Sequence, residues 1–309
     1  MANTTKRVLV TLFLLLVANV SVFAVKKGNP EPTIHALIYP KGQNCSQAIV
    51  SNGLEGEPKM VNDWGDVGNI GDGAWYDVYL PKSGAKKMVV VCPGGGYAYC
   101  SSINEGEFVA RWFLEKGVAT CVVNYRLPNG HPGVPLTDIQ NVFRYLRANA
   151  SKWGVEEIGI IGFSAGGHLA ATATNLWVDE ITRPDFSILV YPVVTMYDEA
   201  THKGTKHYLL GDNPSKGMVD YYSIENQVTS ATPRSLILLS ANDNAVPPVN
   251  SLNYFKRLVE CGVNAEMHIF PEGGHGWGFT CNRYYPGQDR LGDKYRAQFF
   301  EIIENWLLK

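Results

Sequence analysis

The chain has 309 residues, of which 45% are hydrophobic and 18% are charged, as is typical of one globular protein with an extensive core. Lysine and arginine nearly balance aspartate and glutamate, so the formal net charge is -2 and no polybasic run is present. These values argue against nucleic acid and an anionic membrane surface as partners.

The first 24 residues have the features of a secretory signal peptide. Lys6 and Arg7 precede an apolar run over residues 8–18, and small residues follow as far as Ala24. The run is shorter than the roughly 20 residues that a membrane-spanning helix needs. We therefore expect cleavage after Ala24 and a secreted or periplasmic protein with no membrane partner once the signal is removed. An uncleaved N-terminal anchor is the alternative.

Residues 25–73 are rich in glycine, asparagine and aspartate and are weakly periodic, which predicts a wrapping segment with at most one edge strand. The catalytic domain is expected over residues 74–309, where β-like runs alternate with segments of helical period. Most of these runs are continuously apolar, as in parallel strands covered on both faces. They span residues 75–80, 88–92, 119–125, 158–163, 186–194, 235–240 and 265–270.

Apolar stripes at helical spacing mark the buried faces of the predicted helices. The stripes are Ile139, Val142, Phe143 and Leu146; Leu252, Phe255 and Val259; and Phe299, Ile302, Ile303 and Trp306. The alternation of strand and helix predicts an α/β fold with a mostly parallel, doubly wound sheet covered by helices on both faces. Ligands bind at the carboxyl ends of such strands. A long excursion over residues 197–231 is expected to form a lid or a pocket wall.

The sequence GFSAG at residues 162–166 matches the pattern G-x-S-x-G between a buried strand and a helix-like segment. A serine that presents its hydroxyl at the top of a sheet occupies a strained turn, and side chains two residues before or after it would collide with backbone. The helix that follows directs N–H groups at the reacting oxygen. Ser164 is thus a candidate nucleophile, with a glycine-rich packing turn as the alternative.

A serine hydroxyl needs a base to take its proton and a third group to orient that base. Asp243 follows the run at residues 235–240, and His275 follows the run at residues 265–270. The order serine, acid, histidine is that of α/β-hydrolases. Asp243 as a turn residue and His275 as an isolated loop histidine are the alternatives, but three strand-end placements in this order favour a catalytic triad.

A glycine-rich loop, Pro93 to Tyr97, follows the run at residues 88–92. The N–H groups of Gly95 and Gly96, together with that of Ala165, are the predicted oxyanion-hole donors. The loop is not a phosphate-binding loop, because no Gly-Lys-Ser or Gly-Lys-Thr follows it.

Five stretches resemble the secreted α/β-hydrolase esterases known as acetylxylan-esterase-like enzymes, relatives of the hormone-sensitive-lipase group. They are PGGGY, NYRLP, IGIIGFSAGGHLAA, NDNAVPPVNSL and GGHGWG. The resemblance extends from about residue 70 to the C-terminus, and it implies the α/β-hydrolase fold and the triad and oxyanion hole already named. Pro93 stands where the lipase-like group has the histidine of His-Gly-Gly-Gly, so only the glycine positions transfer.

The residues and this resemblance together predict a serine carboxylesterase that removes short acyl groups such as acetyl through an acyl-serine intermediate. Its expected substrate is a small ester or an acetylated carbohydrate such as acetylated xylan. Bulky tyrosines beside the glycine loop favour a short acyl group. The candidate substrate-binding residues are Tyr97, Trp277, Arg283 and Tyr284. A feruloyl esterase, a small serine peptidase and a catalytically silent binding module remain as alternatives.

No histidine spacing matches a metal motif, so we expect neither a metal nor another cofactor. His168, one helical turn beyond Ser164, is expected to pack rather than act as the base. Cys92 and Cys121 lie in apolar runs and are expected to be unpaired. The candidates for disulfides are Cys45, Cys100, Cys261 and Cys281, with no pairing predicted. The sequence indicates no oligomeric state.

Overall fold

The computed structural model describes residues 30–40, 50–279 and 291–308, apart from the side chains of residues 293 and 294. The predicted signal peptide lies outside the described residues, and so do Cys45, Cys281, Arg283 and Tyr284. Predictions on those positions stay predictions.

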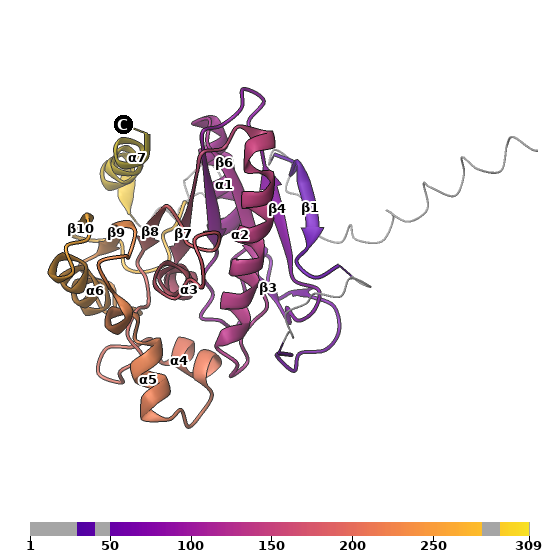
Figure 1. The fold of residues 1–309 in the computed structure, drawn as a ribbon. Coiled ribbons are helices and arrows are strands. Elements are labelled where there is room, and N and C mark those ends of the chain that lie inside the picture. Colours follow the sequence, from indigo (N-terminus) through magenta and orange to yellow (C-terminus); the bar gives the residue numbers. More distant parts are fainter. Residues whose placement is uncertain (1–29, 41–49, 280–290, 309) are drawn as a thin grey trace, which may run out of the picture.

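An eight-stranded sheet forms the centre of the molecule, in the order β1-β4-β6-β5-β7-β8-β9-β10 (Figure 1). The strands from β6 to β10 pair in parallel, whereas β1 and β4 run antiparallel at one edge. This confirms the predicted mostly parallel sheet. The bounds are β1 (Ile34–Leu37), β4 (Trp75–Tyr79), β5 (Lys87–Cys92), β6 (Ala119–Asn124), β7 (Glu157–Phe163), β8 (Phe186–Val190), β9 (Arg234–Ser240) and β10 (Ala265–Phe270).

Two departures from the predicted strands have local causes. Strand β8 ends at Val190, earlier than predicted, because Tyr191 has a φ of 37° and Pro192 has no N–H to continue the ladder. A small antiparallel pair, β2 (Lys59–Met60) and β3 (Val67–Gly68), lies in the N-terminal segment. Strands of two residues carry no detectable period, so the sequence did not predict them.

Helices cover both faces of the sheet (Figure 1). Helices α2, α3 and α6 pack on one face, and α1 and α7 pack on the other. No helix that the structure describes combines the length and apolar character needed to cross a membrane. The helical bounds are η1 (Ile103–Glu107), α1 (Phe108–Glu115), α2 (Gly133–Trp153), α3 (Ser164–Asn175), α4 (Lys203–Leu210), α5 (Lys216–Tyr222), η2 (Ile224–Gln227), α6 (Val249–Glu260) and α7 (Gly292–Leu308).

Strand β5 shows why the central strands are apolar at every position. Met88 and Val90 belong to the core cluster on the α2, α3 and α6 side, whereas Val89 and Val91 belong to the cluster on the α1 and α7 side. Each fully buried side chain of this kind contributes roughly 1.5–3 kcal/mol relative to an exposed one. Burial on both faces therefore removes the alternation that a half-exposed strand would show.

The predicted buried face of α6 was right for Phe255, which packs against the core, and wrong for its other two residues. Leu252 and Val259 are 44% and 56% exposed, whereas Tyr254 and Leu258 are buried. The hydroxyl of Tyr254 accepts a hydrogen bond from Asn175, so this side chain buries its ring without leaving a polar atom unpaired. Along α2, by contrast, the predicted stripe from Ile139 to Leu146 is buried as expected.

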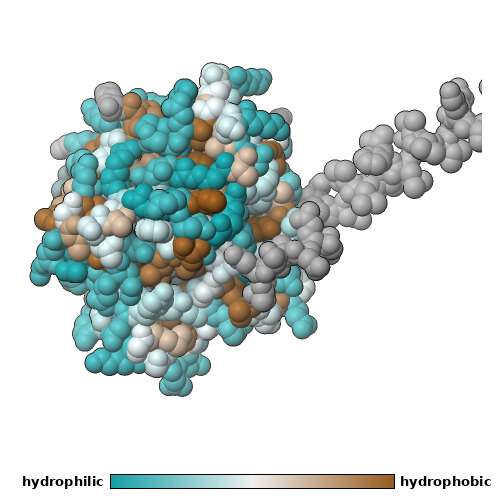
Figure 2. Space-filling model, viewed as in Figure 1, coloured by the Kyte–Doolittle hydropathy of each residue, from teal (hydrophilic) through white to brown (hydrophobic). Residues whose placement is uncertain are grey.

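The face drawn in Figure 2 is largely hydrophilic, and apolar residues form small, separate patches on it. Val178 and Val259 are among the exposed hydrophobic side chains of the described residues, and single exposures of this kind are common on folded proteins.

A buried ion pair attaches the N-terminal segment to the sheet. Arg126 and Asp138 are 1% and 0% exposed at their side chains, and Arg126 Nη2 lies 2.6 Å from Asp138 Oδ1. The backbone N–H of Arg126 donates to Asp138 Oδ2 over 2.7 Å, and the hydroxyl of Tyr39, just after β1, donates to Oδ1 over 2.7 Å. The described part of the segment thus shares the polar core of the main domain.

Asp138→Asn should lower the free energy of unfolding by about 3–5 kcal/mol, because it leaves the Arg126 guanidinium buried without a counter-charge. Urea denaturation followed by tryptophan fluorescence measures the change. The control is Asp179→Asn, which breaks the exposed pair with Arg144 and should leave the urea midpoint almost unchanged. Equal midpoints for the two variants would contradict a stabilising role for the buried pair.

Candidate active site

Three strand ends place the predicted triad at one edge of the sheet. Ser164 follows β7, Asp243 lies just beyond β9, and His275 lies just beyond β10. These strands lie in the consecutive order β7-β8-β9-β10 and run parallel, so their carboxyl ends meet at the same edge. The structure brings the three side chains together.

The histidine bridges the hydroxyl and the carboxylate. His275 Nε2 lies 2.8 Å from Ser164 Oγ, and Nδ1 lies 2.6 Å from Asp243 Oδ2. Since a carboxylate can only accept, these bonds assign the imidazole proton to Nδ1 and leave Nε2 to accept from the serine hydroxyl. The arrangement has the geometry in which an imidazole removes a proton from an attacking serine.

Backbone groups hold the carboxylate in place. The side chain of Asp243 is 1% exposed, and its Oδ1 accepts the N–H groups of Ala245 and Val246 over 3.0 and 2.9 Å. Next to it, Asn242 Oδ1 accepts the N–H of Gly274 over 2.8 Å, which ties the loop after β9 to the loop that carries His275. One carboxylate oxygen is therefore fixed by the backbone, and the other orients the imidazole.

The glycines around Ser164 are required by close backbone approach. A methyl group at Gly162 would lie 2.1 Å from the carbonyl oxygen of Gly166, and one at Gly166 would lie 2.2 Å from the carbonyl oxygen of Cys92. Ser164 itself has a φ of 53°, in the left-handed region that non-glycine residues rarely adopt. The structure thus agrees with the steric reason that the sequence suggested, and it places strain at the reacting hydroxyl.

The glycine-rich loop after β5 lies directly against the serine. A methyl group at Gly94 would lie 2.9 Å from Ser164 Cβ. Gly95 and Gly96 have φ values of 124° and 64°, and a methyl group at Gly95 would lie 2.2 Å from the carbonyl oxygen of Tyr99. Only glycine fits this path of the chain, which exposes backbone N–H groups beside the hydroxyl.

Three backbone N–H groups, two in this loop and one in α3, are candidates to stabilise a negative oxygen. The N–H of Gly94 is already donated to Glu105 Oε2 over 2.7 Å. The N–H groups of Gly95 and Gly96, in contrast, donate to no acceptor among the described residues. Ala165 lies in the first turn of α3, whose N–H groups have no acceptor within the helix. The predicted donors are therefore the ones that remain available.

A buried carboxylate that the sequence did not single out links the two halves of the site. Glu105 is 4% exposed, and its Oε1 accepts the hydroxyl of Tyr191 over 2.7 Å. The ring of Tyr191 lies 4.8 Å from the ring of His275, centroid to centroid, and its hydroxyl accepts the N–H of Gly278. Burial raises the pKa of Glu105, and the hydrogen bonds from Tyr191 and Gly94 oppose that shift.

Two of the predicted substrate-binding residues are corrections. Tyr97 is 1% exposed and its hydroxyl lies 3.0 Å from His168 Nδ1, while Trp277 is 0% exposed and donates to Ser240 Oγ over 2.9 Å. Both rings are packed and hydrogen-bonded inside the protein, so neither side chain can stack on a sugar. Both residues follow strands that end at the active site, and the sequence did not reveal that their side chains are buried. Arg283 and Tyr284 remain untested predictions outside the described residues.

His168 packs as predicted. Its Nε2 lies 2.8 Å from the carbonyl oxygen of Tyr222, which joins α3 to α5, and burial lowers its pKa to about 4. It therefore stays neutral and hydrogen-bonded at neutral pH. The described residues hold no group of three histidine, cysteine or acidic side chains arranged for a metal ion. The cysteines that the structure describes are free, namely Cys92, Cys100, Cys121 and Cys261.

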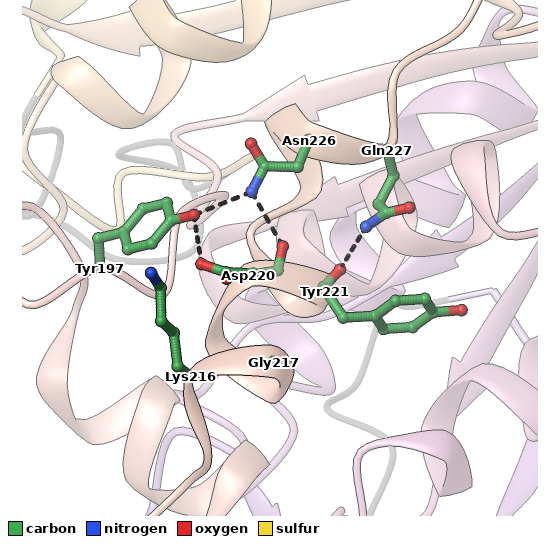
Figure 3. Close-up of a pocket in the computed structure, with 7 residues that line it drawn as sticks. All are labelled: Tyr197, Lys216, Gly217, Asp220, Tyr221, Asn226 and Gln227. Atoms are coloured by element: carbon green, nitrogen blue, oxygen red, sulfur yellow. Dashed lines mark hydrogen bonds between the residues drawn. The ribbon is translucent and has the colours of Figure 1, made fainter.

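The excursion over residues 197–231 contains α4, α5 and η2, which lie at one end of the molecule (Figure 1). A hollow of about 630 Å³ lies on it, and none of the triad residues lines it (Figure 3). The hydroxyl of Tyr197 donates to Asp220 over 2.7 Å and accepts from Asn226, so these polar groups bond to one another. The hollow is therefore separate from the chemistry. Its lining residues are Tyr197, Lys216, Gly217, Asp220, Tyr221, Asn226 and Gln227.

The chain matches a known family and several known proteins. The BD-FAE family matches residues 76–258, a range that includes Ser164 and Asp243. The chain is 35% identical over 235 residues to an acetylxylan esterase of Xylanibacter ruminicola, and 34% identical over 226 residues to endo-1,4-beta-xylanase B of Butyrivibrio fibrisolvens. These alignments cover 74% and 68% of the chain but only 47% and 35% of the relatives, so the chain spans about half or less of their length.

Solved structures share the fold. The crystal structure of an acetyl ester-xyloside bifunctional hydrolase from Caldicellulosiruptor lactoaceticus superposes with a TM-score of 0.68 at 30% identity, over 90% of this chain and 98% of that one. A sugar hydrolase from Lactococcus lactis gives a TM-score of 0.66 at 29% identity, over 81% and 96% of the two chains. The predicted α/β-hydrolase fold is confirmed.

Asp243→Asn should lower kcat for an aryl acetate about 10⁴-fold, as the same change does in a serine protease, because an amide N–H facing Nδ1 selects the wrong imidazole tautomer. Steady-state kinetics with 4-nitrophenyl acetate measure it. The control is Glu272→Gln, which neutralises an exposed carboxylate on the loop of His275 and should leave kcat unchanged. Substantial activity in Asp243→Asn would show that another carboxylate orients the histidine.

Glu105→Gln should lower kcat about 10- to 100-fold with little change in KM. Gly94 and Tyr191 donate to different oxygens of Glu105, so in glutamine one of these donors would face the amide NH2 group and lose its acceptor. The charge that strengthens both hydrogen bonds is lost as well. Glu225→Gln, which alters another buried carboxylate, is the control and should keep the wild-type kcat. If kcat of Glu105→Gln equals that of the wild type in a folded protein, the carboxylate only fills space.

Proposed function

Since the chain belongs to the BD-FAE family of α/β-hydrolase esterases and is a carboxylic ester hydrolase, we propose that it removes short acyl groups, acetyl above all, from a xylan-type polysaccharide or oligosaccharide. The reaction is proposed to run through an acyl enzyme on Ser164. The observation that carries the proposal is the imidazole of His275, 2.8 Å from the serine hydroxyl and 2.6 Å from a buried carboxylate.

The first half of the reaction follows from these distances. His275 Nε2 takes the hydroxyl proton as Ser164 Oγ attacks the ester carbonyl carbon, and the carbonyl oxygen becomes an oxyanion. The N–H groups of Gly95, Gly96 and Ala165 donate to that oxygen. They need no reorganisation as charge develops, and each such donor contributes roughly 2.7–4 kcal/mol of transition-state stabilisation in comparable sites.

The second half reverses the roles of the same groups. The protonated His275 gives its proton to the departing alcohol oxygen, which leaves the acyl group on Ser164. Water then takes the place of the alcohol and gives a proton to Nε2 as its oxygen attacks the acyl carbon. The bond from the acyl carbon to Ser164 Oγ breaks as His275 returns the proton to Oγ, which releases the acid and restores the free serine. Asp243 keeps the imidazole oriented throughout and stabilises its positive charge.

The choice of substrate is supported by the relatives. One relative is described as an acetylxylan esterase, another as a xylanase, and the similar structure is described as an acetyl ester-xyloside hydrolase. A xylan polymer lies outside cells, which fits the proposal that residues 1–24 direct export and are removed after Ala24.

Ser164→Ala should lower kcat by as much as roughly 10⁶-fold, the loss found when the nucleophile of a comparable triad is removed. A fluorophosphonate probe should label the wild type and fail to label this variant. Failure of the folded wild type to react with the probe would mean that the chain is a silent binding module rather than an enzyme.

Assays of the wild-type protein on a series of esters identify the acyl group and the alcohol that it prefers. Nitrophenyl esters from acetate to laurate should show rates that fall with chain length, and acetylated xylan should release acetate. Release of ferulate from feruloylated xylan in preference to acetate would replace the acetyl proposal by a feruloyl esterase.

A further inference from the structure

A histidine on the excursion is held in a defined tautomer. His202 is the N-cap residue of α4, and its Nδ1 accepts the backbone N–H of Thr205 over 3.2 Å and lies 2.8 Å from Thr205 Oγ1. Because Nδ1 accepts from a backbone donor, the neutral ring carries its proton on Nε2. The helix cap therefore fixes both the orientation of the ring and the atom that can donate.

The ring of His202 lies beside the glycine-rich loop over residues 93–97, named the oxyanion loop from here on. A methyl group at Gly96 would lie 3.7 Å from His202 Cε1, which is ordinary contact distance. Burial lowers the pKa of His202, a charge on His275 lowers it further, and the Asp243 carboxylate opposes the shift. The burial that lowers this pKa favours the neutral form of the His202 ring.

One atom of this ring has no role within the described protein. Both hydrogen bonds of the His202 ring are made by Nδ1 with Thr205, and the Nε2–H donates to no acceptor in the described ranges. The ring is half-buried, and Nε2 is bonded to Cε1, the atom nearest Gly96, so this donor lies beside the same glycine-rich loop. A half-buried N–H at a reaction site is suited to a substrate oxygen.

The structure of an acetyl ester indicates which substrate oxygen can accept a hydrogen bond from His202. Its carbonyl oxygen is taken by the backbone amides, and its ester oxygen receives the proton from His275. The methyl group offers no acceptor. Any further acceptor must therefore belong to the alcohol, and a sugar presents hydroxyl and ring oxygens adjacent to the ester, whereas a nitrophenol presents none at that position.

We propose that the Nε2–H of His202 donates a hydrogen bond to a sugar oxygen next to the scissile ester, which makes His202 a specificity residue for acetylated carbohydrate over acetates of simple alcohols. The inference deepens the proposed function and rests on it. A purely structural role as the cap of α4 is the competing explanation, and the two roles use different nitrogens of the ring.

Two substitutions separate the roles. His202→Asn keeps an acceptor near the position of Nδ1, and asparagine is among the best N-cap residues, but it has no donor at the position of Nε2. His202→Gln has the opposite effect, because its amide N–H reaches the position of Nε2 while the cap is lost. Ser215→Asn, which exchanges the cap of α5 on the same excursion, is the matched control.

The experiment compares kcat and KM on 4-nitrophenyl acetate and on a purified acetylated xylo-oligosaccharide, with the thermal midpoint of each protein. We expect His202→Asn to keep the wild-type midpoint and its rate on 4-nitrophenyl acetate within about twofold. Its kcat/KM on the oligosaccharide should fall about tenfold, mainly through KM, as the loss of one neutral hydrogen bond predicts. His202→Gln should retain more of the oligosaccharide activity at a lower midpoint, and Ser215→Asn should match the wild type on both substrates.

The outcomes are distinct. Equal losses on both substrates in His202→Asn, or no loss on either, would overturn the inference, and so would a Gln variant that discriminates as poorly as the Asn variant. A wild-type protein that is inactive on both esters would instead overturn the proposed function.

Discussion

The hydrogen bond between His275 and Asp243 is the constraint on which the rest of the site depends. It spans 2.6 Å between the ends of two neighbouring parallel strands, and it sets the tautomer that lets Nε2 face Ser164. The carboxylate is fixed in turn by backbone N–H groups, so the orientation of the imidazole is traceable to the register of the sheet. The triad can therefore form only when β7, β9 and β10 are paired in the folded sheet, so the catalytic geometry depends directly on the fold.

The parts of this protein that the sequence predicted are those in which local pattern and global fold agree. Central strands buried on both faces are apolar at each position, so they can be recognised in the sequence without knowing which strands they pair with. The turn around Ser164 was predictable because its glycines answer a steric demand that any G-x-S-x-G turn makes. Asp243 and His275 followed from their places after strands, since parallel strands deliver their ends to one edge.

The parts that the sequence did not predict depend on burial, which is decided by distant segments. Glu105 lies beside another acidic residue in the stretch NEGE and looks like a surface carboxylate until it meets Tyr191, 86 residues along the chain. Trp277 and Tyr97 were predicted to bind substrate because they lie next to the active-site loops, but their rings pack inside the protein. Tyr254 took a buried position on α6 because Asn175 satisfies its hydroxyl, and no periodicity reports such a partner.

Two side chains outside the triad, Glu105 and His202, contact the glycine-rich loop beside Ser164 from different elements. Glu105 holds the oxyanion loop through Gly94 and, through Tyr191, the ring that packs on His275, so one buried carboxylate couples the loop after β5 to the loop after β10. His202 reaches the same glycine loop from the excursion, with its ring fixed by the cap of α4. The reacting groups thus come from the ends of parallel strands, whereas the proposed discrimination between alcohols would lie on the excursion over residues 197–231. Substitutions on such a connecting segment can alter specificity without disturbing the sheet.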